Sequence, residues 1–253
     1  IFPAIDKCNR FLSCQNPAKA GTTSFRSVRG LRASPEDGAL RTGLYPMIIE
    51  QIEVTWMSVF CYLLCDEETR DAVLIDPAGD FDVIFGAVER HGAKVRHVIN
   101  THGHWDHTSG NARAVKKTGA TLLIHEADAE HARSIPNRVL SLTLGGKVSP
   151  EPVRLLRGGE TIPLGRQSLD IIHTPGHTPG SICVLAGGNL FTGDTLFTEG
   201  MGRTDMPGGS QTAIMNSIIS IILRLPDDTK IWPGHNYGRF PVSTVREQKR
   251  YYT

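Results

Sequence analysis

Short apolar runs separated by turn residues dominate the chain from Met47 onward. Runs of four to eight residues that are rich in β-branched and aromatic side chains and bounded by Gly, Pro, Asn or Asp are typical of strands. The pattern predicts strands over 48–54, 59–64, 72–75, 95–100, 121–124, 169–173, 182–185, 190–192 and 230–232. Cys61 and Cys65 are four residues apart in the second run, so we expect their side chains on one face of that strand.

Three segments instead repeat apolar residues at helical spacing, over 81–91, 111–117 and 210–225. Ser210 is in position to cap the last helix, which we expect to cover a core through Ile214, Ile218, Ile221, Ile222 and Leu225. The stretch that follows residue 124 is looser as far as residue 159. Strands with interleaved helices in both halves favour an α/β fold over an all-β sandwich.

The first 46 residues differ from the rest in composition. They hold seven basic and three acidic residues, are rich in Ser, Gly, Pro and Arg, and lack sustained periodicity. We expect residues 1–46 to form a flexible N-terminal extension in front of one catalytic domain, residues 47–253. Residues 24–34 are Arg-rich, Ser-rich and free of acidic residues, which is also typical of an organelle transit peptide. Because composition alone is a weak address, a tail on a cytoplasmic protein is the favoured interpretation.

Charge and apolar length restrict the classes of partner. The 253 residues include 27 basic and 26 acidic ones, so the chain lacks the basic excess of a general nucleic-acid binder. The longest apolar stretch, residues 213–225, falls short of the ~20 residues that a bilayer span needs. Five cysteines without a short metal-binding pair favour free thiols. We expect a soluble monomer or homodimer that acts on a small molecule, with no nucleic-acid or membrane partner.

The most informative segment is Thr101-His102-Gly103-His104-Trp105-Asp106-His107, which follows an apolar strand. Desolvating several imidazoles beside a carboxylate is costly unless a metal or another charge compensates for the loss of water. His102 and His104 can point one way from the end of the strand, while Asp106 and His107 turn toward a second position. One short loop could therefore supply ligands to two adjacent metals, since imidazoles and carboxylates are common metal ligands.

Three further candidates share one setting, because each follows an apolar run and is flanked by Gly or Pro. They are His177, Asp194 and His235. With the first cluster they make seven ligands, enough for two metals that share one carboxylate. Such a pair of metals lowers the pKa of a shared water toward neutrality, and Asp106 would orient the resulting hydroxide. Asp76 ends a buried strand and is either a simple turn residue or an acceptor that orients a ligand histidine.

These motifs resemble the metallo-β-lactamase-fold superfamily, whose hallmark is HxHxDH followed by a distant His, Asp and His. The similarity is closest to the glyoxalase II-like (hydroxyacylglutathione hydrolase-like) branch, through residues 102–107, 173–178, 191–197 and 202–205. The resemblance implies a four-layer αββα sandwich and two divalent metal ions, zinc first, with iron or manganese as alternatives. It places His102, His104 and His177 on one metal, Asp106, His107 and His235 on the other, and Asp194 between them.

The activity implied is hydrolysis of a thioester, or of a related ester or lactone, by a metal-bridging hydroxide, with Asp106 and Asp194 as catalytic residues. The chain has Met201-Gly202-Arg203 where the family often has Cys-Gly-Arg or Cys-Gly-Lys followed by aromatics. Arg203 is therefore a candidate contact for an anionic substrate, or alternatively a surface partner of Asp205.

A second activity of the same fold stays open. Persulfide dioxygenases resemble the chain at residues 202–205 and 243–247. Their single iron would use His102, His177 and Asp194, a two-histidine, one-carboxylate set with open positions for oxygen. A β-lactamase is less favoured, because the zinc-cysteine type needs a cysteine where Asp194 stands.

Overall fold

The computed structural model describes residues 46–143 and 145–252. The predicted extension therefore lies outside the described residues, apart from Pro46. None of the helices in the described ranges has the length and apolarity that crossing a bilayer requires.

The first of two large sheets is built from the N-terminal half of the described chain. Its strands, in spatial order, are β1 Met47–Val54, β2 Val59–Asp66, β3 Asp71–Ile75, β4 Lys94–Ile99, β5 Thr121–His125 and β6 Arg154–Leu156. The first three pair antiparallel, whereas β3 to β6 run parallel. Parallel strands place the residues that follow them at one edge of the sheet, and the HxHxDH segment follows β4.

The second sheet is built from the C-terminal half. Its strands, in spatial order, are β14 Ser243–Thr244, β13 Lys230–Pro233, β10 Asn189–Gly193, β9 Ile182–Ala186, β8 Gln167–His173 and β7 Thr161–Leu164. A small hairpin, β11 Leu196–Phe197 with β12 Gly200–Met201, stands apart from it. Strands β10 and β13 are parallel, so the segments after them leave the sheet side by side.

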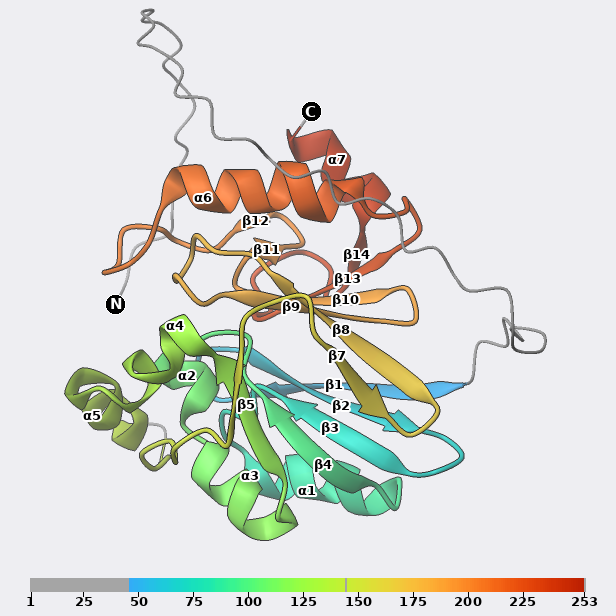
Figure 1. Cartoon of the computed structure of the whole chain (residues 1–253), viewed down its shortest axis with the longest axis vertical. Coiled ribbons are helices and arrows are strands. Elements are labelled where there is room, and N and C mark those ends of the chain that lie inside the picture. Colours follow the sequence, from blue (N-terminus) through green and yellow to red (C-terminus); the bar gives the residue numbers. More distant parts are fainter. Residues whose placement is uncertain (1–45, 144, 253) are drawn as a thin grey trace, which may run out of the picture. The chain divides into compact units, whose positions relative to one another are not determined.

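Helices cover the outer faces of both sheets (Figure 1). The helices are α1 Phe81–Arg90, α2 Trp105–Thr108, α3 Asn111–Thr118, α4 Glu126–Ala129, α5 Ile135–Thr143, α6 Gln211–Asn216 and α7 Val245–Tyr252. Helices α1 and α3 lie on the first sheet, and α6 and α7 lie on the second. A π-helical segment, Ser217–Ile221, and a 3₁₀ turn, Ile222–Arg224, continue α6.

Three clusters of buried apolar side chains lie between the two sheets and the two layers of helices. One cluster, with Tyr62 and Phe191, fills the space between the sheets, and the other two lie between each sheet and its helices. Cys61 and Cys65 share the cluster under α1, as their spacing predicts. The α/β, four-layer αββα sandwich is thereby confirmed.

The stretch between residues 124 and 159 is more regular than its sequence indicates. It contains α4, α5 and β6. Hydrophobic periodicity does not predict helix α5, because its polar side chains are buried and its apolar side chains are exposed. Its polar residues Asn137 and Ser141 are buried, whereas Ile135 and Val139 are 73% and 59% exposed.

The pattern also did not predict the short elements α2, β11, β12 and β14, nor β7 and α7. Strand β7 contains Pro163, which removes a backbone donor and argues against a strand. It is tolerated because β7 is an edge strand, where such a donor is not needed by a neighbour. Helix α7 is mostly polar and its buried residues are few, Val245 and Gln248.

Candidate metal centre

Four candidate ligands come from the segment between β4 and the end of α2. His102, His104, Asp106 and His107 are all buried, with at most 7% of their surface exposed. His104 occupies the N-cap position of α2, and Asp106 and His107 belong to the single helical turn that follows. The ring of His107 lies 4.2 Å from that of His102 between centroids, so the segment gathers its four candidates in one place.

The other three candidates come from the second sheet. His177 lies in the turn after β8, Asp194 follows β10, and His235 follows β13. The backbone N–H of Gly234 donates to the carbonyl of Gly193 at 2.8 Å, which continues the β10–β13 pairing to the residues next to both ligands. The parallel pair of strands therefore brings Asp194 and His235 together across 41 positions of sequence.

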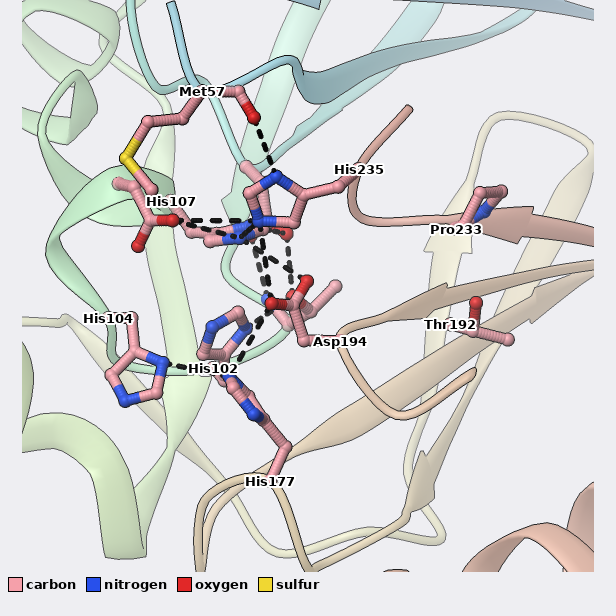
Figure 2. Close-up of polar contacts among 12 residues, drawn as sticks. Met57, His102, His104, His107, His177, Thr192, Asp194, Pro233 and His235 are labelled. Atoms are coloured by element: carbon pink, nitrogen blue, oxygen red, sulfur yellow. Dashed lines mark hydrogen bonds and ion pairs between the residues drawn. The ribbon is translucent and has the colours of Figure 1, made fainter. Parts of the chain in front are cut away.

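Six of the seven side chains, all but Asp106, are labelled in Figure 2 and converge where the segments that follow the strands of the two sheets meet. The candidate ligands form two groups of three, in each of which the potential ligand atoms lie within 4.8 Å of one another: His102, His104 and His177, and Asp106, His107 and His235. Asp194 lies between the groups. Its Oδ2 is 3.5 Å from His177 Nε2 and 3.4 Å from His235 Nε2, and its Oδ1 is 3.4 Å from His107 Nε2.

The hydrogen bonds within the cluster do not satisfy all of its polar atoms, whereas metal ions would. His102 Nε2 and Asp194 Oδ1 are buried with no hydrogen-bond partner within the described part of the chain. His104 Nδ1 lies 2.9 Å from His177 Nε2, and His107 Nε2 lies 3.0 Å from His235 Nε2. A buried polar atom without a partner costs about 1–3 kcal/mol, and ligation by a divalent cation would satisfy these lone pairs.

The electrostatics also favour a cation. Burial, with the neighbouring histidines, keeps the pKa of His102 well below its usual value and lowers that of His104 to about 3, so both are neutral donors. Burial lowers the pKa of His107 too, but the carboxylates of Asp194, Asp76 and Asp106 outweigh it and raise that pKa to about 10. His107 is therefore protonated at neutral pH when no metal is bound, so the second group already holds one positive charge.

Three of the five candidate ligand histidines are oriented through a second ring nitrogen. His107 Nδ1 lies 2.9 Å from Asp76 Oδ2, His177 Nδ1 lies 2.8 Å from the carbonyl of Arg203, and His235 Nδ1 lies 3.0 Å from the carbonyl of Met57. Such partners fix the ring and its tautomer. Here they leave Nε2 of all three rings facing Asp194.

Asp76 is placed as an orienting acceptor. Its side chain also accepts from the N–H and the hydroxyl of Thr101, at 2.8 and 2.6 Å, so it fixes the backbone next to His102 as well. The carbonyls of Met57 and Arg203 could not be found from sequence, because every residue carries one.

Arg203 is the one sequence candidate whose side chain points elsewhere than into the cluster. Its guanidinium forms two hydrogen bonds of 2.7 Å with Asp205 and is 65% exposed. Sequence reasoning also missed two aromatic neighbours of His235. Tyr237 stacks on it at 4.4 Å between ring centroids, and Phe197 packs edge-on at 6.0 Å.

The chain matches a known protein family. The family model described as "Metallo-beta-lactamase superfamily" matches residues 54–235. The hydroxyacylglutathione hydrolase of Polaromonas is 35% identical over 182 residues, which cover 70% of this chain and 62% of that protein.

Two solved structures share the fold. The crystal structure of ETHE1 from Myxococcus xanthus is 32% identical, with a TM-score of 0.69, and covers 81% of this chain and 83% of that one. That of TTHA1623 in a di-iron-bound form is 27% identical, also with a TM-score of 0.69, and covers 79% of this chain and 97% of that one.

Proposed function

The chain belongs to the metallo-beta-lactamase superfamily, in its glyoxalase II-like branch, and from this premise we propose a metal-dependent hydrolase that cleaves a thioester or a related ester or lactone. One observation carries the proposal: two buried groups of three ligand atoms lie on either side of a single carboxylate, Asp194. We further propose that it works in the cytoplasm on a small molecule, as a monomer or homodimer.

In this proposal His102, His104 and His177 would hold one divalent metal, Asp106, His107 and His235 would hold a second, and Asp194 would serve both groups. Zinc is the first choice, with iron or manganese as alternatives. Divalent metals supply Lewis-acid chemistry, which activates water near neutral pH and polarises a carbonyl.

The protein supplies orientation and proton acceptance. Asp106 Oδ2 is 3.5 Å from His235 Nε2, and the residue is buried at 7% exposure. In this proposal it would accept a hydrogen bond from the attacking water and take up its proton. Tyr237, 58% exposed above His235, would contact the substrate at the entrance. Arg203 would meet an anionic substrate group only in competition with Asp205.

No cysteine in the described residues suits a covalent mechanism. Cys61, Cys65 and Cys183 are free and buried, and burial raises the pKa of the Cys183 thiol to about 12. A thiol that stays protonated at neutral pH is a poor nucleophile, which supports water as the attacking group.

A persulfide dioxygenase is the second candidate. It would hold one iron on His102, His177 and Asp194, of which His177 Nε2 and Asp194 Oδ2 are 3.5 Å apart. We favour the hydrolase because it gives a role to Asp106, His107 and His235. A site with one iron would leave these three buried side chains without a metal ion.

Metal analysis combined with two assays separates the candidates. Protein purified without added metal is analysed by ICP-MS, then assayed for hydrolysis of S-acyl glutathione thioesters and for oxygen uptake on glutathione persulfide. The hydrolase predicts about two metal ions per chain, thioester cleavage and no oxygen uptake. About one iron per chain with persulfide-dependent oxygen uptake would replace it by the dioxygenase.

A further inference from the structure

Asp128, in α4, is a buried carboxylate outside the seven candidate ligands. Only 1% of its surface is exposed. Its Oδ2 accepts from the N–H of Gly103 at 2.7 Å and from the hydroxyl of Thr178 at 2.6 Å, and its Oδ1 accepts from the N–H of Gly180 at 2.8 Å. Three donors thus compensate one buried charge.

These donors belong to the two segments that carry the three-histidine group. Gly103 separates His102 from His104, and Thr178 directly follows His177. One segment leaves the first sheet and the other leaves the second. The carboxylate therefore joins the two segments that carry all three histidines, through donors one to three residues from a histidine.

The Gly103 segment is also held from its other side. The side-chain amide of Asn137, in α5, donates to the carbonyl of Gly103 at 2.5 Å. Both peptide units of the residue between His102 and His104 are thus fixed, one by α4 and one by α5. The inverted polarity of α5 follows from this, because its buried face meets a backbone carbonyl rather than an apolar layer.

The packing around Asp128 leaves no room for a side chain at Gly103 or Gly180. A Cβ on Gly103 would lie 2.9 Å from the Asp128 carbonyl, and a Cβ on Gly180 would lie 2.6 Å from Asp128 Cγ. Glycine at both positions lets two segments approach one carboxylate. The arrangement is a built one rather than a chance contact of surface groups.

We propose that Asp128 is the positioning residue of the three-histidine group, setting the separation of His102 and His104 from His177 and so the metal affinity of that group. The inference rests on the proposed function, since it concerns ligands of the proposed metal site. Asp76 contacts His107 directly, so each group has a buried non-ligand carboxylate beside it.

The substitution Asp128→Asn tests this. An amide replaces one oxygen by an NH₂, which then faces either the Gly180 N–H or the Gly103 N–H as donor against donor. Loss of such an outer contact typically costs 10–100-fold in metal affinity. We expect that one zinc-binding step, measured by competition with a chromogenic chelator, weakens about 10–100-fold while the other is unchanged.

Asp66 provides a matched control. It is equally buried, and its side chain accepts from the N–H groups of Glu68, Thr69 and Arg166, joining two segments far from the ligands. Asp66→Asn should lower the melting temperature about as much as Asp128→Asn and leave both zinc-binding steps unchanged. If Asp66→Asn weakens zinc binding to the same degree, the effect is general destabilisation and the positioning role is wrong.

The site concerned is identified in a His104→Ala background, which already breaks the three-histidine group. There Asp128→Asn should produce no further loss in the remaining step, and a full additional loss overturns the assignment. Unchanged zinc binding in Asp128→Asn overturns the positioning role alone. A parent protein that binds no zinc, iron or manganese overturns the proposed function and this inference with it.

Thr178→Val serves if Asp128→Asn does not fold. It removes one of the three donors at nearly constant volume and should weaken the same binding step by a smaller factor. Wild-type affinity in Thr178→Val, with the hydroxyl gone, contradicts the proposal.

Discussion

At the scale of single residues, Asp194 has the most consequential position, because it alone lies between both ligand groups. Burial raises its pKa, but His235 and His107 outweigh that effect and hold the pKa well below its usual value, so the residue is ionised. Asp194→Ala should therefore reduce bound metal at both groups and lower hydrolytic turnover by more than the about 10–100-fold that is typical when a residue that only orients a metal ligand is removed. Metal analysis and the thioester assay check this.

The matched control is Asp205→Asn, which removes an exposed carboxylate bonded to Arg203 and should leave metal content unchanged. Full activity of Asp194→Ala with metal still bound would contradict the ligand assignment.

Protonation of His107 gives a second residue-level prediction. With its pKa at about 10, the metal-free residue is protonated at pH 6, and the pKa of His235 is raised as well. A metal must displace these protons, so zinc binding at pH 6 should release about one proton or more per chain. Zinc affinity should therefore rise with pH, because fewer protons compete for the ligands, by about tenfold per pH unit for each proton released.

Calorimetry in buffers of different ionisation enthalpy measures this release. His102 and His104 should contribute no proton, because the pKa of His104 is about 3 and that of His102 is also low. Asp76→Asn removes one of the carboxylates that raise the pKa of His107 and should reduce the number released. Proton-free binding to the wild-type protein at pH 6 is incompatible with this account.

At the scale of elements, α5 makes the clearest prediction because its polarity is inverted. Asn137→Leu adds apolar volume to a buried position, yet it should destabilise the protein by about 1–3 kcal/mol, since the Gly103 carbonyl loses its donor. Val139→Gln, on the exposed apolar side, should change stability by less than about 0.5 kcal/mol. Urea unfolding measures both, and a stabilising Asn137→Leu would contradict the described contact.

The same helix explains how far sequence reasoning reaches. Strands buried on both faces, such as β2, and helices with apolar inner faces, such as α6, follow from hydrophobic periodicity, and so does the setting of the HxHxDH segment at the end of β4. Helix α5 does not follow from periodicity, because its buried face carries polar side chains. One of them, Asn137, forms a hydrogen bond with a loop from another part of the chain. Asp128 was missed for the same reason, since its donors lie 25 to 52 positions away.

At the scale of the whole described domain, each ligand group takes side chains from both sheets. The first sheet supplies His102 and His104, and the second supplies His177 to the same group. Bound metal would therefore link two halves that otherwise meet through an apolar layer. Metal that binds only the folded state stabilises by about 2.7 kcal/mol per site at a hundredfold excess over Kd.

Chelation should accordingly lower the melting temperature by about 10–20 °C if two sites are filled, and added zinc should restore it. Differential scanning calorimetry with and without EDTA measures the shift. The Asp194→Ala variant, with its sites impaired, should show a much smaller response to chelator. Equal melting temperatures of the wild-type protein with and without metal would argue against a metal link.

The division of the candidate ligands between the two sheets also sets the order in which they become available during synthesis. Because a chain is synthesised from its N-terminus, residues 102–107 emerge before His177, Asp194 and His235. The nascent first half offers several donors at once, but not the closed geometry with which a protein discriminates among divalent ions. With the proposed metal site, the choice among divalent ions would therefore be made late in biogenesis, when the second sheet docks on the first.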